Sequence, residues 1–164
     1  MMKATTGQIT LIPENIPGEL CARPQWVCWR YEERSGTRTK VPHTPSTGLS
    51  ASTTDLMTWA TFSEALAAYE RGHCDGVGFV FSSADPYVGI DLDKCRDPES
   101  GDIDGWAQEV IDRLGVAEAY VEISPSGTGI HIIVEGAVRG GGMRKGPIEM
   151  YSFSRFFAIT GRTL

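Results

Sequence analysis

The most constraining feature of the sequence is a short apolar run, YVGIDLD at residues 87–93, that ends in two aspartates one residue apart. Successive side chains on a strand point to opposite faces, so Asp91 and Asp93 are predicted to share a face while Leu92 turns into the core. Two carboxylates this close repel each other unless a proton or a cation lies between them. The pair is therefore a candidate site for a hard divalent cation. The alternative is a solvated strand end that leads into the polar loop after it.

The composition is that of an ordinary globular chain. Its 164 residues are 41% hydrophobic and 22% charged, which fits one domain with a substantial core. No apolar run approaches the ~20 residues that span a membrane, and the start of the chain lacks a signal peptide. We therefore expect a cytoplasmic protein with no membrane partner. The four cysteines form no C-x-x-C pair, so neither a zinc site nor a disulfide framework is expected.

The charge distribution bears on nucleic-acid binding. A formal net charge of −6 counts against a strong electrostatic nucleic-acid binder, because such domains usually carry a basic face. However, Arg139, Arg144, Lys145 and Arg155 cluster in a late segment whose only acid is Glu149. A local basic groove on an acidic domain is therefore compatible with the sequence.

The pattern of apolar residues and turn signals predicts an α+β domain with a mainly antiparallel sheet. One helix is predicted to begin at a Thr61-x-x-Glu64 capping box and to stop at Gly72, and a second to end at Gly115. The predicted strands, some of them joined by tight turns, lie at residues 25–33, 37–45, 76–83, 87–93, 119–124, 129–136 and 148–161.

The stretch SPSGTGIHIIV, residues 124–134, combines a glycine-punctuated turn with a histidine at the head of a strand. Small residues and free backbone N–H groups at Ser126, Gly127 and Gly129 would suit the close approach of phosphate oxygens, and His131 could add a donor. The alternative is a hairpin turn followed by a histidine on the polar face of a strand. The stretch is neither a Walker loop nor a G-x-G-x-x-G dinucleotide signature, because no G-K-[ST] follows it and it opens a strand.

The late stretch GPIEMYSFSRFFAITG contains the third unusual feature, a lone acid in an aromatic and aliphatic segment. Glu149 and Arg155 would share a face of an uninterrupted strand, although the SFS sequence between them could interrupt it with a bulge. They could form only a structural ion pair. Together with Asp91 and Asp93, however, Glu149 would complete the three carboxylates that a two-cation phosphoryl-transfer site needs.

These three stretches in this order resemble the motifs of the archaeo-eukaryotic primase superfamily, especially the primase-polymerase domains of phages and plasmids. The resemblance extends over most of the chain, from QWVCW and TKVPHTPSTG to TGR. It implies a catalytic core of RNA-recognition-motif (RRM) type over about residues 76–162, with a small N-terminal α/β part over about 20–75. It also implies that residues 1–164 are one catalytic domain, the N-terminal piece of a longer replication protein.

The resemblance further implies template-dependent nucleotidyl transfer by a DNA primase or polymerase in phage, plasmid or mobile-element replication. Asp91, Asp93 and Glu149 would be the catalytic ligands of Mg²⁺ or Mn²⁺. The partners would be single-stranded or primed DNA, nucleoside triphosphates and a fused or separate replicative helicase. The incoming nucleotide would contact residues from three stretches of the chain, namely Ser126, Gly127, Gly129, His131, Arg155 and Lys40.

Two departures and several alternatives stand beside this interpretation. The chain has no cysteine-rich zinc module, and it stops at ITGRTL directly after the last motif. A catalytically inactive or weak nucleic-acid-binding relative is the main alternative, with Phe153, Phe156 or Phe157 stacking on bases. A haloacid-dehalogenase-type phosphatase fits poorly because Lys94-Cys95 follow the aspartate pair in mid-chain. A rolling-circle nicking enzyme would need two metal-binding histidines separated by one residue, and His131-Ile132-Ile133 supplies only one.

Overall fold

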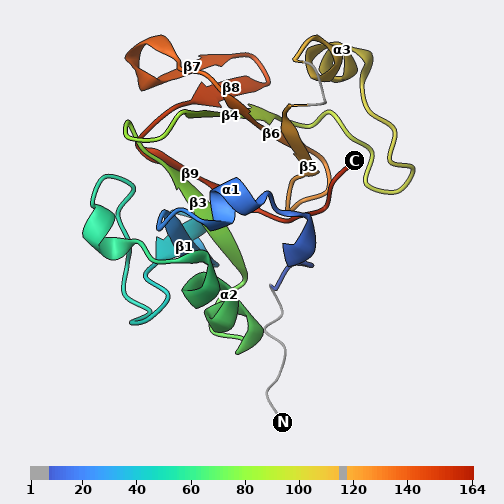
Figure 1. Ribbon diagram of the computed structural model, residues 1–164. Helices are drawn as coiled ribbons and strands as arrows, with labels where there is room; N and C mark the ends of the chain where they lie inside the picture. The colour runs from blue at the N-terminus through green and yellow to red at the C-terminus, as the bar shows by residue number, and fades with distance from the viewer. Residues whose placement is uncertain (1–7, 115–117) are drawn as a thin grey trace.

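The computed structural model describes residues 8–114 and 118–164, which form two antiparallel sheets (Figure 1). The four-stranded sheet has the order β2-β1-β3-β9, and the five-stranded sheet has the order β5-β6-β4-β8-β7. The strands are β1 (Trp26–Arg34), β2 (Thr37–His43), β3 (Gly76–Phe81), β4 (Tyr87–Leu92), β5 (Tyr120–Ile123), β6 (Ile130–Glu135), β7 (Gly142–Lys145), β8 (Ile148–Tyr151) and β9 (Arg155–Ile159).

The helices are short and lie beside the two sheets, with α2 next to the four-stranded sheet and α3 next to the five-stranded one (Figure 1). They are α1 (Gly18–Cys21), α2 (Phe62–Glu70) and α3 (Gly105–Arg113), with 3₁₀ turns η1 (Pro13–Asn15), η2 (Leu56–Thr58) and η3 (Arg139–Gly141). No helix within the described residues is long and apolar enough to cross a bilayer.

Local sequence signals explain where the helices begin and end. The Thr61 side chain accepts a hydrogen bond from the Glu64 N–H and the Glu64 side chain reaches back, so the predicted capping box is present at the start of α2. Beyond its C-terminus, Gly72 has a φ of 76°, a backbone conformation that glycine adopts at little cost. The predicted end of the second helix at Gly115 lies outside the described residues, and α3 is described as far as Arg113.

Each sheet buries an apolar cluster against its helix. Ala65 and Ala68 of α2 pack in one cluster with the aromatic residues of β1 and β3. Ala107 and Ile111 of α3 pack in a second cluster with the aliphatic residues of β4 and β6. Because side chains alternate along a strand, the opposite face of the five-stranded sheet is left for Asp91 and His131, which face the four-stranded sheet.

The two sheets contact each other where β4 and β6 face β3 and β9. The ring of His131 stacks on the ring of Phe157 with centroids 4.9 Å apart, which joins the inner face of one sheet to the other. Gly89 lies on this same face, and a Cβ atom there would overlap the rings of Phe81 and Phe157. The glycine in the YVGIDLD run is therefore required for the approach of the four-stranded sheet.

The α+β class and the antiparallel pairing are confirmed, and the strands divide into two sheets. The four-stranded sheet combines β1 and β2, from the part predicted as N-terminal, with β3 and β9 from the part predicted as RRM-like. The two predicted parts therefore share a sheet. That the later part is an RRM-type core stays a prediction.

The late segment 148–161 is not a single strand. It breaks at residues 152–154, where Ser154 has a φ of 59°, and its halves β8 and β9 belong to different sheets. The predicted interruption at SFS is thus confirmed and is larger than a bulge. Periodicity along one strand is therefore the wrong explanation for any contact between Glu149 and Arg155. The short edge strand β7 was not predicted.

Candidate active site

A row of polar residues crosses the inner face of the five-stranded sheet, with one residue from each strand. The strand registers pair Glu122 of β5 with His131 of β6, His131 with Asp91 of β4, Asp91 with Glu149 of β8, and Glu149 with Arg144 of β7. We call these five residues the polar row. Directly paired side chains in adjacent strands lie within contact distance, so the register alone brings these charged groups together.

Three carboxylates converge at the centre of the row. One oxygen each of Asp91, Asp93 and Glu149 lies within 4.8 Å of the others. Asp93 directly follows the end of β4, where its backbone N–H donates to the Pro147 carbonyl at 2.9 Å, and Leu92 between the aspartates is fully buried. Three carboxylate oxygens are the ligands that Mg²⁺ and Mn²⁺ prefer, so this donor set fits a hard divalent cation.

The surroundings of Asp91 disfavour its ionised form. Burial raises the pKa of Asp91 above its ordinary value, the nearby His131 opposes the rise, and the charges of Asp93 and Glu149 add to it. A carboxyl whose ionised form is disfavoured by burial and by like charges gains from any cation placed beside it. The site therefore favours a bound cation on electrostatic grounds as well as by ligand type.

Two arginines flank Glu149, whose side chain is almost fully buried. Arg144 Nη1 lies 3.3 Å from Oε1, and Arg155 Nη2 lies 3.9 Å from Oε2. Arg155 also lies over the ring of Tyr151, 4.4 Å from its centroid. The contact between Glu149 and Arg155 crosses from β8 to β9, so it depends on how the two sheets meet.

His131 is buried between the carboxylates and a second acid. Its Nε2 lies 3.8 Å from Asp91 Oδ1, and its Nδ1 lies 3.1 Å from Glu122 Oε1. Burial alone would lower the pKa of His131, but the hydrogen bond and charge of Glu122, with a contribution from Asp91, raise it above its ordinary value. Because a carboxylate only accepts, Nδ1 donates to Glu122 and Nε2 is directed at the metal-ligand candidates.

Glu122 is a residue that the sequence did not single out. Its side chain is fully buried, and Oε2 accepts hydrogen bonds from the Tyr120 hydroxyl at 2.8 Å and from the N–H groups of Thr160 and Gly161 at 2.8 and 2.9 Å. With His131 on the other oxygen, every neighbour donates, which is the environment of an ionised carboxylate. The signal in the sequence was an acid at an inward position of an otherwise apolar strand, AYVEIS.

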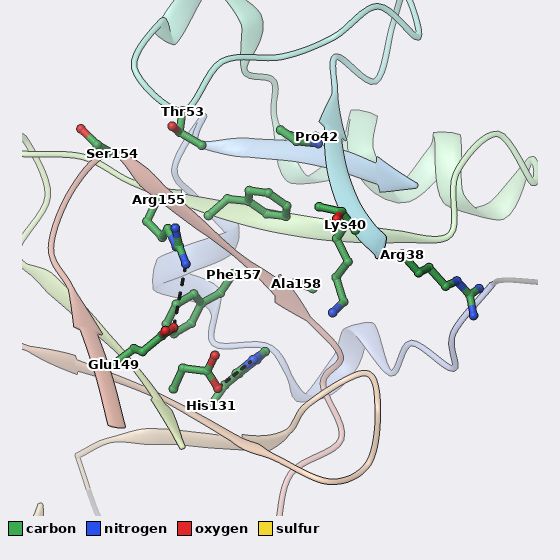
Figure 2. A pocket seen from close by; sticks show the side chains of 13 residues that line it. Arg38, Lys40, Pro42, Thr53, His131, Glu149, Ser154, Arg155, Phe157 and Ala158 are labelled. Carbon is green, nitrogen blue, oxygen red and sulfur yellow. Dashed lines mark ion pairs between the residues drawn. The ribbon is translucent and has the colours of Figure 1, made fainter. Parts of the chain in front are cut away.

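These groups open into a pocket of about 510 Å³ between the two sheets (Figure 2). His131 and Glu149 lie on one wall, and Lys40 of β2 points into the pocket from the other. Asp91, which also lines the pocket, is paired between His131 and Glu149 in the sheet. Burial lowers the pKa of Lys40, whereas the charges of Asp91 and Asp93 act in the opposite direction. Ser154 and Arg155 also line the pocket. The pocket thus places cations opposite carboxylates, which suits a polyphosphate held with a divalent cation.

The glycine turn lies elsewhere. Ser126, Gly127 and Gly129 are described by the structure but do not line the pocket. The expectation of free backbone N–H groups there is wrong for residues 127–129. Gly127 N–H donates to the Ser124 carbonyl, and the N–H groups of Thr128 and Gly129 donate to serine hydroxyls.

Backbone conformation and close packing explain why glycines occupy this turn. Gly127 has a φ of 79°, and a Cβ atom on Gly129 would approach the Leu92 carbonyl to 2.9 Å. The hydroxyl of Ser126 lies 2.8 Å from that of Thr128 and 3.1 Å from that of Ser124. A nucleotide-binding role for Ser126, Gly127 and Gly129 stays a prediction.

The chain is similar to part of a known phage protein. No family model matches the chain. The chain is 36% identical over 143 residues to a protein named DNA primase-polymerase from Nitratiruptor phage NrS-1. The match covers 84% of this chain and 19% of the phage protein, so the chain spans about a fifth of its relative. The chain is thus a moderately distant homologue of part of that phage protein.

Proposed function

We propose that the chain catalyses template-dependent nucleotidyl transfer, as a DNA primase, a DNA polymerase or both, in phage, plasmid or mobile-element replication. The observation that carries the proposal is the convergence of Asp91, Asp93 and Glu149 beside a pocket whose other wall carries Lys40 and Arg155. The relationship to a phage primase-polymerase supports the same reaction class. Three carboxylates would have no purpose in a module that only binds a phosphate backbone, because they would repel it.

The proposed roles follow from position. Asp91, Asp93 and Glu149 would hold Mg²⁺ or Mn²⁺ in a two-metal site. The bound ions would lower the pKa of an attacking hydroxyl and neutralise the leaving pyrophosphate. Lys40 and Arg155 line the pocket and would contact the triphosphate. His131 would offer its Nε2 atom from the wall that carries the carboxylates. The substrates would be nucleoside triphosphates and single-stranded or primed DNA, and a fused or separate replicative helicase would be the partner.

The direct test is nucleotide incorporation. The purified chain is incubated with single-stranded DNA of defined sequence, labelled nucleotides and Mg²⁺ or Mn²⁺, with and without a primer. We expect incorporation that depends on the metal and follows the template sequence, and that disappears in Asp91→Asn and Glu149→Gln. Asp102→Asn, which changes an exposed acid, serves as the control and should retain activity. Binding of DNA without any incorporation under either metal would favour the inactive relative.

A further inference from the structure

The hairpin formed by β7 and β8, together with the segments on either side of it, presents a basic surface on an acidic protein. Residues 142–147 are all exposed and include Arg144 and Lys145, and Arg139 is exposed in η3 just before them. From residue 136 to the end, the sequence has a single acid, Glu149, and that side chain is buried. We call Arg139, Arg144, Lys145 and Phe153 the hairpin surface. Its exposed charges are all positive, although the whole chain has a net charge of −6. Arg144 shares the inner face of the sheet with Glu149, and Lys145, the next residue of the same edge strand, points to the opposite face.

Phe153 adds a fixed aromatic ring to this surface. Its exposed fraction is 40%, and the ring lies directly on Gly141, where a Cβ atom would overlap it. The Ser152 N–H donates to the Gly141 carbonyl at 3.0 Å, which ties the segment carrying the ring to the segment before β7. An exposed ring that is already held in place loses little conformational freedom when another flat group stacks on it.

The hairpin surface is continuous with the pocket. Ser154 and Arg155, which follow Phe153 directly, line the pocket. Arg144 contacts Glu149 at 3.3 Å, so its guanidinium joins the exposed edge of the five-stranded sheet to the carboxylates. An extended ligand that lay along β7 and β8 would therefore lead to the candidate active site.

We propose that the hairpin surface binds single-stranded DNA, with Phe153 stacking on an unpaired base and with Arg139, Arg144 and Lys145 contacting phosphates. The proposal rests on the proposed function, since it supplies the path by which a template strand reaches the pocket. Aromatic rings among cations are the usual platform for single strands. A protein strand pairing with the free edge of β7 is disfavoured, because charged side chains on an edge strand block such pairing.

The test is binding of a fluorescent oligothymidylate, measured by anisotropy without metal or nucleotide at several salt concentrations. Phe153→Ala should raise the Kd by roughly five- to hundredfold, the range for loss of one stacked base. Arg139→Ala and Lys145→Ala should each weaken binding and reduce the slope of log Kd against log salt by about 0.7. Phe153→Trp keeps a flat ring and should bind within a few-fold of the unmodified chain.

Arg71→Ala is the matched control. Arg71 caps the C-terminal end of α2, on the far side of the molecule from β7 (Figure 1), and its loss should leave both Kd and salt slope unchanged. Thermal melts check that each variant is folded. Unchanged binding in Phe153→Ala, Arg139→Ala and Lys145→Ala would overturn the proposal, as would equal losses in Arg71→Ala or an unmodified chain that binds duplex better than single strands.

Failure of the two proposals can be told apart. If the oligonucleotide binds with the expected dependence on Phe153 but no nucleotide is incorporated, the hairpin surface stands and the proposed catalytic function falls. If nucleotides are incorporated while the hairpin variants bind and extend like the unmodified chain, the catalytic function stands and the template path lies elsewhere.

Discussion

Asp91 on β4 and Glu149 on β8 are direct register partners, so two acids from distant parts of the chain lie side by side on the inner face of one sheet. His131 and Arg144 occupy the next positions of the polar row on either side. The sheet thus places a cation or potential cation at each flank of the carboxylate pair. This arrangement stabilises the acids in part and leaves the remaining repulsion for a metal ion to relieve.

The first prediction concerns stability without metal. Burial and the neighbouring carboxylates raise the pKa of Asp91 in the folded state. A raised carboxyl pKa means that the ionised form destabilises the fold, so this group favours folding at low pH and the benefit is lost as pH rises through its folded pKa. We therefore expect Asp91→Asn to melt higher than the unmodified chain at pH 7 without metal, by about 2–4 °C for each kcal/mol of repulsion relieved.

The gain in Asp91→Asn should shrink as pH is lowered, because the unmodified Asp91 then becomes protonated. Thermal melts at pH 7 and at lower pH measure the difference in melting temperature between Asp91→Asn and the unmodified chain. Asp102→Asn, an exposed position, should melt like the unmodified chain at each pH. A lower melting temperature for Asp91→Asn at pH 7 would indicate a structural role for the carboxylate instead.

The second prediction concerns metal binding. Adding Mn²⁺ or Mg²⁺ should raise the melting temperature of the unmodified chain, because a ligand that binds only the folded state stabilises it by mass action. At a metal concentration 100 times the Kd the gain is about 2.7 kcal/mol. Asp93→Asn and Glu149→Gln should lose most of this shift, and a chelator should reverse it. An equal shift in the unmodified chain and both variants would place the cation elsewhere.

The position of the aspartate pair could be predicted from the sequence because it depends on a local rule. Side chains alternate along a strand, so Asp91 and Asp93 share a face wherever the strand lies. The capping box at Thr61 is equally local and was predicted for the same reason. That Glu149 approaches Asp91 was inferred from the set of three acids, but it depends on the pairing of β4 with β8, which no local pattern specifies.

The parts that escaped prediction depend on how distant strands meet. Glu122 is stabilised by donors from β6 and from residues 160–161, so its importance becomes visible only when those segments are in place. An ion pair between Arg155 and Glu149 was expected from a shared strand face, but its cause is different, because β8 and β9 enter different sheets after the break at SFS. The glycine turn was misjudged because its N–H groups find partners within the turn itself.

The third prediction separates nucleotide binding from metal binding at His131. Its Nε2 faces the pocket and lies 3.8 Å from Asp91, a distance longer than a hydrogen bond. Hydrogen bonds to charged groups contribute about 1.5–3 kcal/mol, so His131→Ala should raise the Kd of a nucleoside triphosphate by roughly ten- to hundredfold. Calorimetry of Mn²⁺ binding without nucleotide should change little. Loss of metal affinity with nucleotide affinity kept would make His131 a metal ligand.

The fourth prediction concerns Glu122, whose carboxylate joins three parts of the fold. Glu122→Ala would leave the Tyr120 hydroxyl and the N–H groups of Thr160 and Gly161 buried without an acceptor, and His131 without its partner. Each orphaned donor costs about 1–3 kcal/mol, and losing one partner of a buried charged pair costs about 3–5 kcal/mol in all. We expect the melting temperature to fall by roughly 10 °C or more.

Two further variants make the Glu122 prediction specific. Glu122→Gln keeps one carbonyl oxygen as an acceptor for the Thr160 and Gly161 N–H groups but removes the charge, so it should lose less stability than Glu122→Ala. Glu135→Ala removes an exposed acid at the end of β6 and should change the free energy of unfolding by no more than about 0.5 kcal/mol. Chemical denaturation of the three variants gives their free energies of unfolding, and so their order of stability. Equal stability of Glu122→Ala and Glu135→Ala would mean that water or a rearranged backbone satisfies the donors, and that Glu122 does not anchor this end of the polar row.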